Sequence, residues 1–279
     1  MKKFFIITRN LNKNRDIVER LKSEIESKGG ECEYAASPED EDKEQLSVPE
    51  GYDCIITIGG DGTIIGAAQM TFGMDIPLLG VNRGHLGYLC ELDEVGIFSA
   101  IDRLLNDDYE IEERMMLKGY VDFAGADSRM HALNDIVISA GYGISVLHLS
   151  VSVNGKHLYS YICDGLILST PTGSTAYNLS ANGPIVDPKA RAILLTPINP
   201  HTLNSRSIVL DQNDEICVEI IKRRNKTEET GDVAFDGAHK RVLHIGEKLL
   251  VKRAENCTNM VILGELSFLE RIGKKLRAD

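Results

Sequence analysis

Residues 54–68, with the sequence CIITIGGDGTIIGAA, constrain the fold more than any other stretch of the chain. Five residues typical of a buried strand run directly into Gly59-Gly60-Asp61-Gly62-Thr63, and small and apolar residues then resume at helical spacing. This pattern predicts a strand, a tight loop and a helix. We expect the glycines to allow positive φ and, lacking a Cβ, to let a ligand approach the backbone N–H groups.

Such a loop is suited to a phosphate group, because the helix N-terminus behind it adds partial positive charge. Asp61 places a carboxylate in the same turn, which suits a group that must touch both a phosphate and the hydroxyl that attacks it. The spacing excludes the G-x-x-x-x-G-K-[ST] and G-x-G-x-x-G patterns. The alternative is a glycine-rich turn with a surface aspartate.

Length and charge limit the remaining possibilities. A chain of 279 residues predicts two domains. The net charge of −11 disfavours nucleic acid and anionic membranes as partners, so an anionic ligand must be held locally. The six cysteines form no C-x-x-C pair, which predicts reduced thiols in a cytoplasmic protein without a zinc site or disulfides. The apolar run that begins at Phe4 is too short for a signal peptide or a membrane helix.

The N-terminal part of the chain alternates strand and helix patterns. Apolar runs at 4–7, 54–58 and 76–82 predict strands, and stripes at 17, 21 and 25 and at 97, 101 and 104 predict helices. We expect Asn12 or Asn14 to cap the first helix. The alternation predicts an α/β domain, a parallel sheet with helices on both faces, over residues 1–108.

From residue 109 onward the pattern changes to short β-rich runs, with an Asn154-Gly155 hairpin signal among them. We therefore predict a mainly β domain over 109–264, interrupted by one helical stretch after Gly173. Residues 265–279 have apolar positions at helical spacing, and we expect this terminal helix to pack back on the first domain.

A second constellation lies at 163–178, CDGLILSTPTGSTAYN. A hydrophobic strand ends in small hydroxylic residues and enters a helix whose first turn carries Ser174, Thr175 and Tyr177. Hydroxyls and free N–H groups at a helix start can bind ribose, carboxamide or phosphate. The structural alternative is that these residues are helix caps.

Taken together, these motifs resemble the NAD kinase family. The resemblance spans about residues 55–240 and rests on Gly59–Thr63, Val81–Leu89, Asn134-Asp135, Asp164-Gly165 through Thr172–Tyr177, and Pro200–Leu203 with Arg206. Gly-Gly-Asp-Gly-Thr alone also occurs in lipid kinases and phosphofructokinases, whereas Thr-Gly-Ser-Thr-Ala-Tyr is specific.

The resemblance implies an N-terminal α/β domain, a β-rich C-terminal domain and an NAD site in the cleft between them. It implies that ATP or another donor phosphorylates the 2′-hydroxyl of the adenosine ribose of NAD, with Asp61 as the catalytic base and Mg²⁺ held by donor phosphates rather than by a protein cage. It also implies a homodimer or homotetramer. The donor loop comprises Gly59, Gly60, Gly62 and Thr63, and the implied NAD contacts are Asn134, Asp135, Asp164, Thr172, Thr175, Ala176, Tyr177, Ser180 and Asp236.

Two positions depart from the family pattern. Asp135 stands where many members have glutamate, and Ile162 stands where many have arginine, so a charge-assisted contact is missing there. Two other functions remain open from sequence: a lipid or sugar kinase that shares the glycine loop, and a dinucleotide-binding sensor without catalysis.

Overall fold

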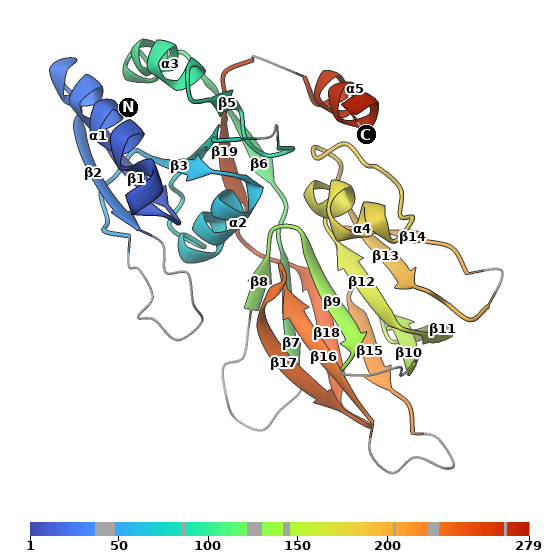
Figure 1. The fold of residues 1–279 in the computed structure, drawn as a ribbon. Coiled ribbons are helices and arrows are strands. Elements are labelled where there is room, and N and C mark those ends of the chain that lie inside the picture. Colours follow the sequence, from blue (N-terminus) through green and yellow to red (C-terminus); the bar gives the residue numbers. More distant parts are fainter. Residues whose placement is uncertain are drawn as a thin grey trace. The chain divides into compact units, whose positions relative to one another are not determined.

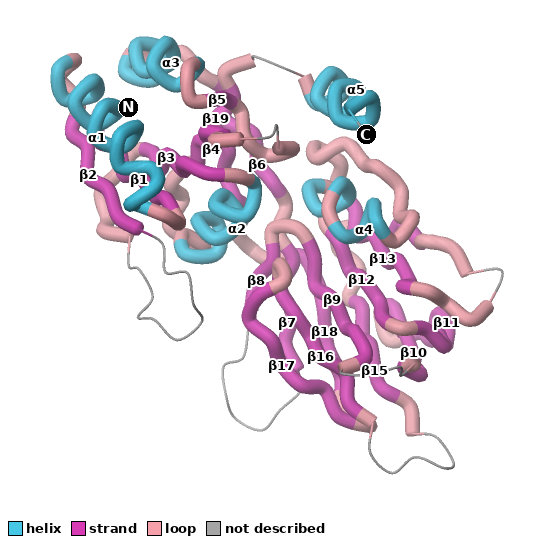
Figure 2. Tube along the Cα trace, in the orientation of Figure 1, coloured by secondary structure: helices cyan, strands magenta, loops and turns pink. Residues whose placement is uncertain are grey.

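The protein consists of two compact units. The structure, a computed structural model, describes residues 1–36, 48–84, 87–121, 130–141, 146–202, 205–222, 229–264 and 267–278. The first unit comprises Met1–Arg114 together with Thr258–Asp279, and the second comprises Met115–Cys257. Figures 1 and 2 show the elements of each unit.

The first unit is built on one sheet with the order β2-β1-β3-β4-β19-β6, and β5 pairs with β4. The pairs among β2, β1, β3 and β4 are parallel, in register Phe4↔Cys54 and Ile55↔Leu78. Continuous apolar runs are typical of parallel strands buried on both faces. The strands are β1 (Lys3–Thr8), β2 (Glu31–Ala36), β3 (Cys54–Gly59), β4 (Leu78–Asn82), β5 (Leu92–Asp93), β6 (Glu110–Arg114) and β19 (Thr258–Ile262).

Helices cover both faces of this sheet, as the sequence predicts. On one face, α1 (Leu11–Ser27) and α3 (Gly96–Leu105) bury their apolar stripes against alternate strand residues such as Leu79 and Val81. On the other face lies α2 (Asp61–Met70), because a Cβ added at Gly80 would overlap the side chain of Ile64. The cap of α1 is Asn10, whose side chain accepts from Lys13 N at 2.9 Å, so the expected cap at Asn12 or Asn14 is wrong.

The first unit extends to Arg114 rather than to residue 108, because β6 pairs antiparallel with β19 in register Thr258↔Arg114. The change of pattern at 109 is therefore a change to an antiparallel edge strand, and the chain enters the second unit after it. Residues 258–264, which the sequence assigned to the second domain, also belong to the first unit. The terminal helix α5 (Phe268–Ala278) lies in the first unit as well.

The second unit contains two antiparallel sheets of six strands. One has the order β11-β10-β15-β18-β7-β8 and the other β14-β13-β12-β9-β16-β17. Inward-facing residues of both sheets, Leu149 and Ile138 among them, form one hydrophobic core.

The strands of the first sheet are β7 (Leu117–Val121), β8 (Met130–Ala132), β10 (Leu147–Val153), β11 (Lys156–Cys163), β15 (Ile216–Ile220) and β18 (Lys248–Arg253). Those of the second sheet are β9 (Asp135–Ala140), β12 (Gly165–Ser169), β13 (Ala192–Ile198), β14 (Ile208–Asp211), β16 (Thr230–Phe235) and β17 (Ala238–His244). A 3-10 helix, η1 (Thr172–Thr175), and a short helix, α4 (Tyr177–Ser180), follow β12.

Two general properties bear on the class of protein. Among the described residues, no helix combines the length and hydropathy needed to cross a membrane. All six cysteines are free thiols, and four of them are buried.

The packing of α2 on β4 predicts opposite effects for two glycine substitutions. Gly66→Ala lies within α2 with open space around it, so it should raise the free energy of unfolding by about 0.5–1 kcal/mol. Gly80→Ala should lower it by about 1–3 kcal/mol, since its Cβ would also lie 3.0 Å from Cys90 Cα. Urea denaturation of both variants measures the difference. Equal stability of Gly80→Ala and the parent would contradict this packing.

Candidate functional site

The glycine loop of the first unit joins β3 to α2 directly. Gly60 is the N-cap residue of α2, Asp61 is its first residue, and Thr63 N donates to Gly60 O at 2.9 Å. None of Gly59, Gly60 and Gly62 adopts the positive φ that glycine allows. Limited space explains why positions 59 and 62 are glycine. A Cβ at Gly59 would lie 3.1 Å from Thr63 Cβ, and one at Gly62 would lie 3.3 Å from Arg9 Nη1. A Cβ at Gly60 would meet nothing within 4 Å.

Arg9 is a cation at this loop that the sequence reasoning missed. It follows β1 directly, and its Nη2 donates to Gly62 O at 2.7 Å. Its Nη1 would lie 3.3 Å from a Cβ added at Gly62. The signal was available, because β1 and β3 were both predicted as parallel strands and the carboxyl ends of such strands meet at one edge. A residue after the first strand therefore lies beside the loop.

The carboxylate of Asp61 binds backbone rather than another side chain. Oδ2 accepts from Tyr88 N at 2.8 Å, and Oδ1 accepts from Leu89 N at 3.1 Å. Gly87 makes this approach possible, because a Cβ there would lie 2.7 Å from Asp61 Cγ. The predicted catalytic residue is thus held by a segment 27 and 28 residues further along the chain.

In the second unit, Asp236 braces the turn before β9. Its Oδ2 accepts from Leu133 N at 2.8 Å, and its Oδ1 accepts from Asn134 N at 2.8 Å and Asp135 N at 3.0 Å. Asp236 itself has φ 50°, a left-handed backbone that aspartate tolerates better than most residues. The structure therefore gives Asp236 the geometry of a support for Asn134 and Asp135.

Asp135 is 5% exposed and lies beside Asp236. Burial, and then the charge of Asp236, raise the pKa of its carboxyl to about 7. Two neighbouring polar atoms, Asn134 Oδ1 and Thr172 Oγ1, are buried without a hydrogen-bond partner. Gly173 lies against the same turn, because a Cβ there would lie 2.7 Å from Asn134 Cα. Buried polar atoms without partners are costly, so they fit a ligand-binding role.

The polar and small residues that follow β12 divide into two groups. Ser174 and Asn178 are buried and structural: Ser174 Oγ donates to Val186 O at 3.1 Å, and Asn178 Oδ1 accepts from Thr196 Oγ1 at 2.7 Å. The side chains available to a ligand are the half-buried Thr175 and Ala176 and the exposed Tyr177 and Ser180.

Asp164 lies apart from Thr172 within the second unit. It precedes β12, whereas Thr172 follows it, and a strand of five residues spans roughly 17 Å. Asp164 Oδ2 accepts from Asn199 Nδ2 at 3.0 Å. The structure brings together Asn134, Asp135, Asp236 and Thr172 but not Asp164. Ile162, in place of the expected arginine, is 36% exposed on the edge strand β11.

Family models match both parts of the chain. A model of the ATP-NAD kinase N-terminal domain matches residues 9–109, and one of the ATP-NAD kinase C-terminal domain matches residues 133–263.

Curated relatives match nearly the whole length. The chain is 44% identical to the NAD kinase of Agathobacter rectalis, covering 98% of both chains. It is 38% identical to that of Lachnospira eligens, covering 99% of this chain and all of the relative.

Solved structures show the same fold. Yeast NADH kinase complexed with NADH matches with a TM-score of 0.85 and 24% identity, over 99% of this chain and 88% of the other. An NAD kinase from Archaeoglobus fulgidus in complex with ATP matches with a TM-score of 0.80 and 23% identity, over the full length of both.

Fold and site together define a phosphotransferase with an α/β unit that carries a glycine loop and a β unit that carries a braced turn. The chain belongs to the ATP-NAD kinase family, as its sequence resemblance indicates. Sequence left two alternatives open, a lipid or sugar kinase and a dinucleotide-binding sensor without catalysis. Membership in the ATP-NAD kinase family supports neither of them, and both are set aside.

The raised pKa of Asp135 predicts how stability changes with pH. Between the ordinary value of 3.8 and about 7, the folded protein keeps a proton that the unfolded chain releases. The free energy of unfolding should therefore fall as pH rises through this window. Between about pH 5 and about pH 8 the parent should lose about 3 kcal/mol more than Asp135→Asn.

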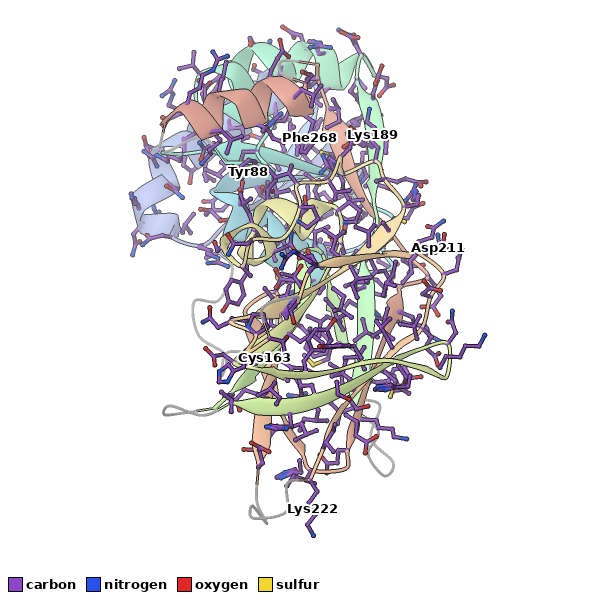
Figure 3. All side chains as sticks on the ribbon, turned by 90° about the vertical axis from the view of Figure 1, so that its right-hand side faces the viewer. Tyr88, Cys163, Lys189, Asp211, Lys222 and Phe268 are labelled. Atoms are coloured by element: carbon purple, nitrogen blue, oxygen red, sulfur yellow. The ribbon has the colours of Figure 1, made fainter. Side chains whose placement is uncertain are left out.

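Urea denaturation at several pH values measures this difference. Asp211→Asn, at the exposed position labelled in Figure 3, is the control and should follow the parent. Parallel curves for the parent and Asp135→Asn would contradict the assignment.

Proposed function

We propose that this chain transfers the γ-phosphoryl group of ATP to the 2′-hydroxyl of the adenosine ribose of NAD, giving NADP and ADP. The observation that carries the proposal is the position of Asp61, at the first residue of α2 in the glycine loop of an ATP-NAD kinase domain. The new bond joins the ribose 2′-oxygen to phosphorus, the bond from phosphorus to ADP breaks, and the hydroxyl proton passes to Asp61.

The glycine loop stabilises charge on the donor phosphates in this proposal. Gly60 leaves open space beside the N-terminus of α2, where backbone N–H groups and the helix dipole favour an anion. Gly59, Gly62 and Thr63 shape the turn, and the Arg9 guanidinium beside Gly62 adds positive charge. Phosphoryl transfer depends mainly on this positioning and charge stabilisation.

We also propose Mg²⁺, or another divalent cation, as the companion of ATP. Among the described residues, no group of three or more His, Cys, Asp or Glu side chains is arranged to hold a metal ion. In this proposal the phosphates of ATP and water would hold the cation, with Asp61 as the nearby protein carboxylate. When bound, such a cation neutralises charge on the phosphoryl oxygens.

The second unit supplies the proposed NAD contacts. The polar atoms Asn134 Oδ1 and Thr172 Oγ1 are buried without partners, which supports a role in binding the dinucleotide. Asp135, Thr175, Ala176, Tyr177 and Ser180 complete the proposed set, and Asp236 holds Asn134 and Asp135 in place. Asp164 is proposed as a more distant contact.

We further propose a cytoplasmic homodimer or homotetramer. The free thiols support a reducing compartment. The edge strand β11 exposes Leu158, Tyr159 and Ile162 at 37%, 41% and 36%, and exposed apolar side chains on an edge strand support association with a second copy.

A coupled assay of NADP formation from NAD and ATP tests the function, and Asp61→Asn tests the mechanism. The substitution keeps the side-chain size but cannot accept the proton. Removing general-base help of this kind costs roughly 10²- to 10⁴-fold in rate. We therefore expect kcat to fall at least about a hundredfold, with the Kd for NAD measured by calorimetry within about threefold of the parent.

Near-normal turnover by Asp61→Asn would end the base assignment. Because Asp61 also binds Tyr88 N and Leu89 N, the melting temperature of the variant must be measured alongside. A variant that loses turnover but keeps its melting temperature separates proton transfer from loss of folding.

Asp164→Ala tests the distant contact. Removal of a hydrogen-bonding partner of a bound ligand typically costs a few kcal/mol, so the apparent KM for NAD should rise about tenfold or more. Asp211→Ala, a change to an exposed acid in the same unit, is the control and should leave KM unchanged. An unchanged KM in Asp164→Ala would remove Asp164 from the site.

A further inference from the structure

The terminal helix α5 is attached to the first unit through a buried ion pair. Arg271 is 6% exposed, and its Nη2 lies 2.9 Å from Oε2 of Glu91, which is 8% exposed. Arg271 Nη1 also donates to Cys90 O. The other carboxylate oxygen of Glu91 accepts from Leu263 N at 3.1 Å. The charges are therefore paired and hydrogen-bonded, as buried charges must be.

The residues that Arg271 holds belong to the segment that binds Asp61. Tyr88 N and Leu89 N donate to the two oxygens of Asp61, Cys90 Sγ donates to Gly59 O at 4.0 Å, and Glu91 N donates to Gly80 O at 3.0 Å. Residues 88–91 thus contact the glycine loop and β4. Arg271 contacts two of these four residues, at Cys90 O and at the Glu91 side chain.

A second residue of α5 reaches the same segment. Lys275 Nζ lies 5.3 Å from the centre of the Tyr88 ring, within the range of a cation–π contact. Figure 3 shows Tyr88 beside α5, the helix that begins at Phe268. Two cationic side chains one turn apart on α5 therefore contact residues 88–91.

We infer that α5 positions the catalytic carboxylate: Arg271, through Cys90 and Glu91, fixes the backbone N–H groups that orient Asp61. The inference rests on the proposed role of Asp61. A carboxylate that accepts two backbone hydrogen bonds has its orientation set by those donors, and a base must be held within about 0.5 Å of its productive geometry. Arg271 is a positioning residue, since it does not touch Asp61 itself.

The experiment uses the double variant Arg271→Met/Glu91→Gln. Arg271→Met alone would leave the Glu91 charge buried without its partner and risks unfolding. In the double variant the amide oxygen introduced at position 91 can still accept from Leu263 N, and no charge is left unpaired. Arg277→Met is the matched control, because Arg277 is exposed on the same helix. We expect kcat to fall at least about tenfold in the double variant, with KM for NAD within about threefold, and the control to match the parent.

Amide hydrogen exchange at Tyr88 and Leu89 in the absence of substrates provides a readout besides activity. Their N–H groups donate to Asp61, so exchange should accelerate in the double variant and not in Arg277→Met. Asp61→Ala gives the rate for donors that have lost this acceptor. Arg271→Lys with Glu91 intact keeps the charge pair and should recover part of both kcat and protection.

Unchanged kcat in the folded double variant overturns the inference, whether or not exchange accelerates. A loss of kcat with unchanged exchange at Tyr88 and Leu89 also overturns it, because the effect would then not pass through these donors. Failure of the proposed role of Asp61 would be detected by a different variant. In that case Asp61→Asn would retain turnover, whatever the result for the double variant.

Discussion

Parallel pairing of β1, β3 and β4 is the constraint on which the glycine loop of the first unit depends. The register Thr8↔Ile58 and Gly59↔Asn82 brings the carboxyl ends of three strands to one edge. Residues that follow these strands therefore meet there: Arg9 binds Gly62 O, and Arg83 N donates to Gly59 O at 3.0 Å. The register of the strands therefore determines the position of the loop that carries Asp61, without any contribution from a ligand.

Both units use a carboxylate to hold backbone N–H groups of a distant segment. Asp61 accepts from two consecutive residues and Asp236 from three. Charge-assisted hydrogen bonds of this kind are stronger than neutral ones and set the direction of the main chain. In the first unit the acid itself is the proposed base, whereas in the second unit the acid supports its neighbours Asn134 and Asp135.

Sequence predicted what is local along the chain. The strand, loop and helix around Asp61 and the stripe at Ile17, Leu21 and Ile25 follow from periodicity within a few turns. Contacts between distant residues carry no local pattern, so neither the crowding of Gly87 against Asp61 nor the brace at Asp236 could be predicted. The boundary was misplaced for the same reason: the partner of β6 is β19, at the far end of the chain.

The place of β19 has a consequence for biosynthesis. It lies between β4 and β6 in the first sheet, although the whole second unit separates it from them along the chain. A ribosome releases the N-terminal strands first. Their sheet lacks the interior strand β19 until Ile262 has emerged. The contiguous Met115–Cys257 unit has all its strands earlier. Vectorial synthesis therefore lets the β unit complete its strands first, while the part of the β4 edge that β19 covers stays unpaired until β19 emerges.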